Sequence, residues 1–72
     1  MDKAEIAKIE AYLRRKFELP SLSVRGRPRK DDSAEVYIGD EFIGIIHRDD
    51  DDEDLSWNFT MAILQIDVDG ED

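Results

Sequence analysis

The stretch from Ser33 to Val68 sets the strongest limits on how this chain can fold. It holds most of the aromatic and β-branched residues, and its apolar residues mostly alternate with polar ones, which is the period of a half-buried β-strand. Gly39-Asp40 lies between two apolar runs and favours a two-residue hairpin turn of the primed type. The stretch therefore predicts antiparallel strands that need another element to cover one face.

The N-terminal residues supply that element, because they predict a helix over residues 2–17. Asp2 followed by Glu5 is a capping-box pattern, and Pro20 stops the helix. The apolar residues recur at spacings of three and four, so they share one helix face: Ile6, Ile9, Leu13 and Phe17. A helix of this length is about 24 Å long. That is enough to cross one small sheet.

The chain is thus predicted to be a single α+β domain over residues 1–72, with the helix packed on a four-stranded antiparallel meander. The strands are expected at residues 22–27, 34–38, 41–47 and 55–67. Residues 48–54 form an acidic loop, because six consecutive carboxylates repel one another and stay solvated, and residues 68–72 form a frayed tail. The expected core comprises Ile6, Ile9, Leu13, Phe17, Val36, Ile38, Phe42, Ile46, Trp57, Phe59 and Met61.

Charge is distributed unevenly along the chain, whose net charge is −9. Residues 1–30 carry nine Lys/Arg against four Asp/Glu, and residues 31–72 carry one Arg against fifteen acids. An acidic protein repels phosphates and is a poor general nucleic-acid binder. The absence of cysteine excludes disulfides and thiolate chemistry. With no apolar run of transmembrane length and no signal-peptide pattern, we expect a cytoplasmic protein that does not enter a membrane.

The basic residues nevertheless form a candidate patch, provided that the first strand pairs near the end of the helix: Arg14, Arg15, Lys16, Arg25, Arg27, Arg29 and Lys30. Such a patch suits RNA, a phosphate or an acidic partner. The alternative is a solvated face, partly neutralised by Asp49–Asp54. Residues 25–28 also match the minor-groove-binding AT-hook. A basic edge strand that runs into a turn is the better interpretation.

No catalytic, metal or cofactor site is predicted. The acidic run lacks the spaced ligands and the glycine of a calcium loop, and residues 67–71 are equally incomplete. His47 is the only histidine; Asp49 is near it in sequence, but loop surface is the better interpretation of Asp49 than an orienting partner. The serines show no nucleophile-elbow context. The aromatic residues Tyr12, Tyr37, Trp57 and Phe59 suit base stacking, but their apolar neighbours favour packing in a core or interface.

Three segments of the chain resemble a family of short bacterial proteins known only as a domain of unknown function. They are the opening MDKAEIAKIEAYLR, the central RPRKDDSAEVYIGDEFIG and the closing NFTMAIL. The resemblance covers nearly the whole chain. It implies a self-standing small bacterial protein, and it brings no activity, cofactor or catalytic residue with it.

These observations predict a non-enzymatic interaction or adaptor module that acts through protein–protein contacts. Binding of RNA or DNA by the basic half is the alternative. One helix covers one face of a small sheet, which leaves a candidate self-association face of Ile43, Ile45, Leu64 and Ile66. The long fourth strand would also overhang its partner, and a two-fold homodimer would pair that overhang. A bulge or bend near residues 61–63 that folds the strand end over its own sheet is the other interpretation.

Overall fold

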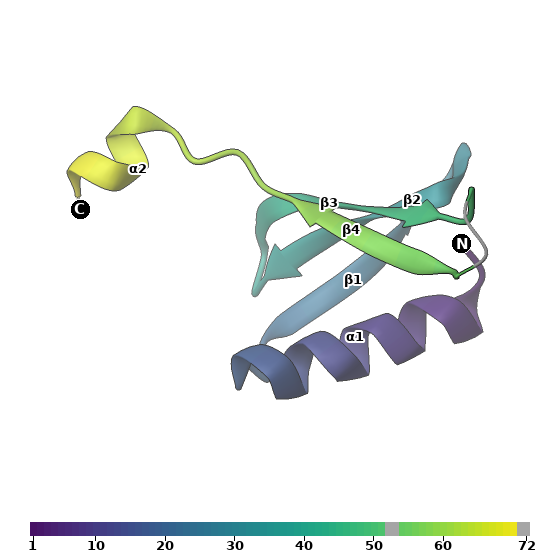
Figure 1. Cartoon of the computed structure of the whole chain (residues 1–72). Helices are drawn as coiled ribbons and strands as arrows, with labels where there is room; N and C mark the ends of the chain where they lie inside the picture. Colours follow the sequence, from purple (N-terminus) through teal and green to yellow (C-terminus); the bar gives the residue numbers. More distant parts are fainter. Residues whose placement is uncertain (52–53, 71–72) are drawn as a thin grey trace.

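The computed structural model of the chain describes residues 1–51 and 54–70 (Figure 1). Residues 52–53 of the predicted acidic loop and residues 71–72 of the predicted tail lie outside the described part. The elements are, in chain order, α1 (Lys3–Phe17), β1 (Leu22–Arg27), β2 (Lys30–Ile38), β3 (Glu41–Asp49), β4 (Ser56–Thr60) and α2 (Gln65–Asp69). The strands form one antiparallel sheet in the order β1-β2-β3-β4. The predicted α+β meander with an N-terminal helix is confirmed.

Local sequence explains both ends of α1. The Asp2 carboxylate accepts a hydrogen bond of 2.8 Å from the Glu5 amide, as an N-cap should. The reciprocal half of the predicted capping box does not form, because the Glu5 carboxylate binds residues of the sheet instead. At the other end Glu18 adopts the left-handed conformation, with φ 52°, and the Leu19 amide donates to the Arg14 carbonyl. The chain can then turn into β1.

The core is small and lies between α1 and the β1–β2 half of the sheet. Its buried apolar residues are Ile9, Leu13, Leu22, Val24, Ala34, Val36 and Ile46. Ile6 and Phe59 pack against it while half-buried. The sequence pattern found the helical and central members, but four predicted core residues are exposed: Phe17, Phe42, Trp57 and Met61. We correct those four assignments.

A β-bulge explains the exposure of Phe42. Val36 pairs with Gly44, whereas the next residue, Tyr37, pairs with Phe42, so Ile43 is an extra residue in β3. One extra residue breaks the alternation, so that the side chains before it and after it no longer occupy the faces that strict alternation predicts. Phe42 therefore lies beside Tyr37 on the face away from α1, with ring centroids 5.7 Å apart. Strict alternation through residues 41–47 had placed it on the α1 face.

The fourth strand is shorter than the predicted 55–67. β4 ends at Thr60, which pairs with Ile45, immediately before the bulge disrupts the ladder of β3. The chain then leaves the sheet as a C-terminal arm, residues 61–70, that ends in α2 (Figure 1). The Asp67 carboxylate accepts from the Leu64 amide at 3.0 Å and Gly70 closes the helix with φ 72°. A helical turn therefore replaces the predicted strand end and part of the predicted tail.

The outer edge of β1 is covered by side chains of α1. The Arg14 Nε donates to the Leu22 carbonyl at 2.7 Å, and the Val24 amide donates to the Glu10 carboxylate at 2.8 Å. Glu10 and Arg14 also pair with each other across 3.5 Å. Sheet edges otherwise expose unpaired backbone groups that invite another strand. In this fold α1 occupies the β1 edge, whereas β4 has only β3 as a neighbour among the described strands.

Candidate functional site

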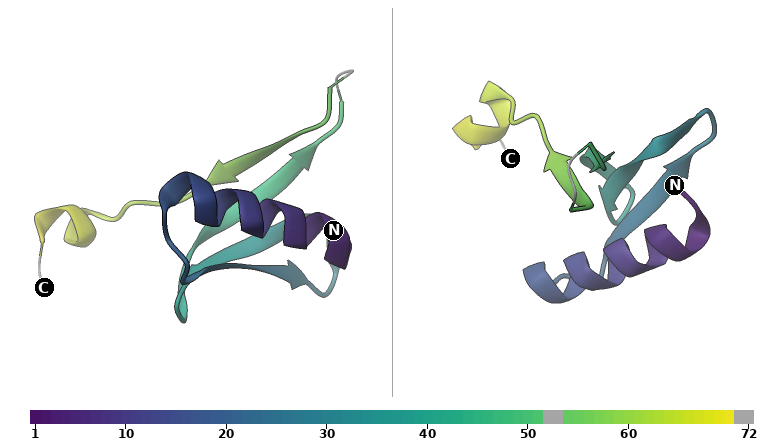
Figure 2. Two further views of the ribbon diagram at one scale, coloured as in Figure 1. Left: turned by 90° about the horizontal axis from the view of Figure 1, so that it is seen from below. Right: turned by 45° about the vertical axis from the view of Figure 1, so that its right-hand side comes forward.

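The ribbon views show α1 lying on one face of the sheet (Figure 2). Between α1 and the β3–β4 half of that face, side chains line a groove. Four strands spaced by about 4.8 Å make a sheet roughly 19 Å wide, whereas one helix is about 10 Å wide. Because α1 packs against β1, it cannot reach the far half of the same face. The groove has a volume of about 930 Å³ and is lined by 13 residues. This is the upper end of the size range for ligand pockets.

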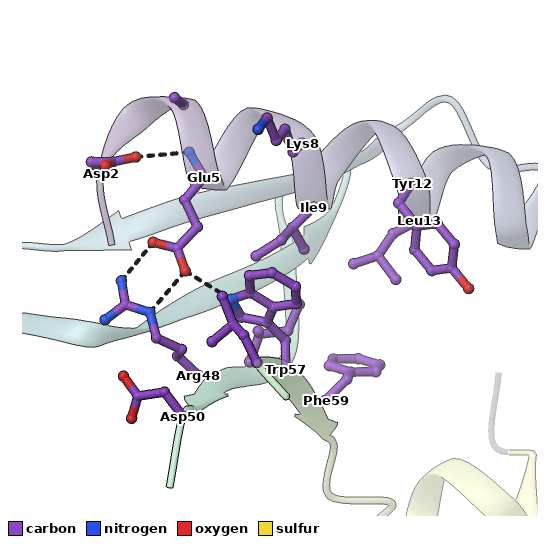
Figure 3. Close-up of a pocket in the computed structure, with 13 residues that line it drawn as sticks. Asp2, Glu5, Lys8, Ile9, Tyr12, Leu13, Arg48, Asp50, Trp57 and Phe59 are labelled. Atoms are coloured by element: carbon purple, nitrogen blue, oxygen red, sulfur yellow. Dashed lines mark hydrogen bonds and ion pairs between the residues drawn. The ribbon is translucent and has the colours of Figure 1, made fainter. Parts of the chain in front are cut away.

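Most of the groove is apolar (Figure 3). Ile9, Tyr12 and Leu13 form the helical wall, and Trp57 and Phe59 form the opposite wall from β4. Trp57, the only tryptophan of the chain, leaves 39% of its surface exposed. An exposed large aromatic side chain beside other apolar residues is typical of a binding surface.

A charged cluster closes the groove at the N-terminal end of α1 (Figure 3). Arg48 donates two hydrogen bonds to the Glu5 carboxylate, of 2.9 and 2.5 Å, and the Trp57 indole N–H donates a third of 2.8 Å. Together these contacts lower the pKa of Glu5 to about 2: the bonds from Arg48 have the largest effect, burial opposes them, and the bond from Trp57 adds to the lowering. The carboxylate in turn raises the pKa of Arg48.

This cluster positions the groove walls rather than performing proton chemistry. Glu5 comes from α1, Arg48 from β3 and Trp57 from β4, so one carboxylate connects three elements. A carboxylate with a pKa near 2 and three donors is a weak general base at neutral pH. Its geometry instead fixes the indole ring of Trp57 against the open side of the groove. We therefore call Glu5–Arg48–Trp57 the brace: it closes one end of the groove and holds the two walls, α1 and β4, at a fixed separation.

The brace predicts a specific acid sensitivity. Because the folded-state pKa of Glu5 lies below its ordinary value of 4.5, its contribution to stability is complete above pH 4.5. That contribution falls as the pH drops through the folded-state value of about 2. Glu5→Gln should lower the free energy of unfolding at pH 7 by about 1.5–3 kcal/mol, the worth of hydrogen bonds to a charged group.

Urea unfolding of wild type and Glu5→Gln between pH 2 and 7 measures this effect. The gap between the two proteins should be constant above pH 5 and should shrink below pH 4.5. Glu41→Gln is the control, because it removes an exposed carboxylate. Its free energy of unfolding should equal that of the wild type at every pH from 2 to 7. A wild-type and Glu5→Gln gap that is independent of pH would show that the ionised form of Glu5 contributes nothing.

The structure does not gather the seven cations of the predicted basic patch. Arg14, Arg15 and Lys16 lie in the last turn of α1, where Arg14 contacts the start of β1. Arg27, Arg29 and Lys30 lie at the opposite end of β1, near the N-terminus, whose ammonium group contacts the Asp31 carbonyl. Thirteen helical residues separate the two ends of α1, which is roughly 20 Å. The candidate patch is therefore two smaller groups.

Arg25, the seventh cation, and Arg27, the second arginine of the AT-hook match, already have partners within the domain. The guanidinium of Arg25 stacks on the Tyr37 ring at 3.8 Å and lies on the face away from α1. The Arg27 guanidinium donates to the Ser33 hydroxyl at 3.1 Å. An AT-hook needs an extended, isolated backbone, whereas residues 25–28 belong to β1 and its turn. The structure thus agrees with a basic edge strand.

The four residues of the predicted self-association face are also separated. Ile43 is the bulge residue and packs against the core, whereas Ile45 is half-buried on the opposite face. Leu64 and Ile66 lie on the C-terminal arm and are each 59% exposed. Of the four, only the two arm residues are exposed. His47 is exposed on the sheet.

Within residues 1–51 and 54–70, the side chains of His, Asp and Glu form no group of three or more that could hold a metal ion. In the same ranges, neither helix combines the length and apolar character of a membrane-crossing span.

Sequence reasoning missed the groove because its parts come from distant segments. Glu5 is 43 residues from Arg48 and 52 from Trp57. Arg48 was placed in the acidic loop, and Trp57 and Phe59 were assigned to the core. The sequence did hold one signal for the groove: four predicted strands make a sheet wider than the single predicted helix that covers it. That comparison predicts an uncovered half-face, although it does not say which strands form it.

Comparison with known proteins gives a family and nothing more. No curated protein and no solved structure matched the chain. The profile of one family, described as protein of unknown function (DUF3126), matches residues 5–67. These residues include most of α1, the whole sheet and the brace, so the match covers the sheet and most of the groove lining. The chain belongs to this family, DUF3126.

Proposed function

We propose that the protein is a non-enzymatic interaction module whose groove between α1 and β4 binds an apolar, acidic segment of a protein. The observation that carries the proposal is the open aromatic wall of Trp57 and Phe59 beside the apolar face of α1. A second helix laid on that half-face would complete the covering of the sheet, as two-layer domains require. Helix-in-groove recognition uses this arrangement.

Charge supports an acidic segment as the partner. Lys8 lies on the groove wall, and Arg15 lies beside Tyr12 at the other end of that wall, 5.8 Å from its ring. The carboxylate of Glu5 is already neutralised by Arg48. Asp2 and Asp50 lie at the brace end of the groove, so we place the acidic part of the partner toward the C-terminal end of α1.

Fluorescence of Trp57 tests the proposal, because the only tryptophan of the chain lies in the groove. We would titrate the protein with synthetic 14-residue peptides that carry Leu at helical spacings and Glu elsewhere. Binding should shift the Trp57 emission to the blue with micromolar affinity. Scrambled peptides of equal composition should leave it unchanged. Tyr12→Glu should weaken binding at least tenfold, whereas Tyr37→Glu, on the opposite face, should not.

The alternative function is binding of RNA or DNA through the cations of the basic half. Mixed oligonucleotides at two salt concentrations test it, since phosphate contacts make affinity fall steeply with salt. Salt-sensitive binding that is lost on replacing Arg25, Arg27 and Arg29 would favour nucleic acid over the peptide groove. A reproducible enzymatic turnover, abolished by one substitution in the groove, would overturn both proposals.

A further inference from the structure

The C-terminal arm is the largest uncovered apolar segment of the described chain. Met61, Ile63, Leu64, Ile66 and Val68 are 46–71% exposed, and α2 buries none of its residues. A helix of five residues is far below the length that is stable alone in water. Five apolar side chains within eight residues also exceed what isolated surface exposure explains. The arm therefore has the character of a segment that packs against something.

The arm cannot easily pack in the groove of its own chain. It continues the direction of β4 away from the sheet, which gives the molecule a long dimension of 42 Å against 24 Å in the other two (Figure 1). To enter its own groove it would have to reverse direction directly after Thr60. Residues 59–66 contain no Gly, Pro, Asn, Asp or Ser, the residues that tight turns use. A groove on another copy needs no such reversal.

We propose that the C-terminal arm of one copy packs in the groove of a second copy, and that the second copy returns its own arm in the same way. This inference rests on the proposed function of the groove and names its occupant. The apolar side chains of the arm would contact the aromatic wall, Trp57 and Phe59, and Tyr12 on α1. The reciprocal exchange is two-fold symmetric, which closes the assembly at two copies.

Charge and size agree with this occupant. The acids of the arm end, Asp67 and Asp69, would meet the cations at the C-terminal end of α1. The sequence continues with two more acids, Glu71 and Asp72. Each copy contributes the ten residues of its arm and the 13 residues that line its groove. That sum falls within the 20–30 residues a side of a standard specific interface.

Sedimentation of the full chain gives the first test. We expect a species of twice the 8.3 kDa monomer mass at micromolar concentration. The double variant Leu64→Asp/Ile66→Asp should sediment as a monomer and keep the wild-type far-ultraviolet spectrum, because neither side chain is buried. A wild-type monomer at 100 µM would overturn the proposal. A dimer that persists in the double variant would also overturn it, since another surface would then form the contact.

Disulfide trapping tests the exchange itself, because the chain has no cysteine. Equimolar Tyr12→Cys and Ile66→Cys variants, one isotopically labelled, would be mixed in a glutathione redox buffer. We expect the mixed disulfide to exceed either homodisulfide at least tenfold. Lys30→Cys with Ile66→Cys is the matched control, because Lys30 lies in the β1–β2 hairpin, and it should give the random ratio. A random ratio for the first pair would contradict arm exchange.

The peptide titration separates failure of this inference from failure of the proposed function. Repeated on Leu64→Asp/Ile66→Asp, whose groove the arm no longer fills, it should give tighter peptide binding than the wild type. Unchanged affinity in a monomeric wild type would overturn arm exchange and leave the groove as a site for another protein. Loss of the Trp57 response in both proteins would overturn the proposed function.

Discussion

Gly44→Ala is expected to separate β4 from β3. A Cβ atom at this position would overlap the carbonyl oxygen of Thr60 and would lie 2.8 Å from the Phe59 ring and 3.0 Å from the Met61 Cβ. The first and last of these contacts involve the backbone or a Cβ, which cannot move without displacing the strand. Overpacking of this kind lowers the free energy of unfolding by about 1–3 kcal/mol.

The measurement is paired urea unfolding, followed by Trp57 fluorescence for β4 and by far-ultraviolet circular dichroism for the whole domain. In Gly44→Ala the fluorescence midpoint should fall below the circular dichroism midpoint, because β4 is released first. Gly26→Ala is the matched control: its Cβ would meet only the Ile6 Cδ1 at 3.2 Å, the flexible end of a side chain. Equal midpoints for both variants would show that β4 tolerates displacement.

Leu22→Ala should cost about 2–5 kcal/mol, the range for truncating a buried leucine. Leu22 is 1% exposed and lies in the core between α1 and β1. One core in a domain of this size supplies only about 3–5 kcal/mol in total. The variant should therefore be largely unfolded at 37 °C, even though a leucine at this edge-strand position attracts no attention in the sequence.

Phe42→Ala is the control for Leu22→Ala in thermal melting experiments. The ring is 51% exposed and contacts Tyr37 edge-on, so we expect a loss of about 1 kcal/mol, the scale of one aromatic pair. The sequence pattern made the opposite assignment and placed Phe42 in the core. A loss for Phe42→Ala as large as that for Leu22→Ala would contradict the bulge at Ile43.

Local signals predicted the parts of the fold that local physics decides. Asp2 at the start of α1 and Gly39 in the hairpin turn, with φ 61°, required only their immediate neighbours. The length of β4 was not predictable in this way. The alternation from Leu55 to Ile66 fits a long strand, and only the bulge in the neighbouring strand ends the pairing at Thr60. A bulge inserted in an apolar run leaves no mark in the sequence.

The candidate site shows the same division. The apolar stripe of α1 that forms one wall was predicted, because its spacing is a property of one helix. The brace was not, since it depends on where three elements meet. Trp57 was assigned to the core on hydrophobicity alone, yet its indole N–H reaches the Glu5 carboxylate at the groove edge. Hydrophobicity cannot separate a core aromatic residue from one that lines an open wall.

The cover that α1 places on the β1 edge also limits how copies of this protein can join. Glu10 and Arg14 occupy the backbone groups of Leu22 and Val24 that a further strand would need. A sheet with one blocked edge offers a single end for growth, so two copies that meet through their β4 sides leave no end for a third. Edge-to-edge addition into an open fibre, the hazard of small β-sheets, would therefore stop after one step.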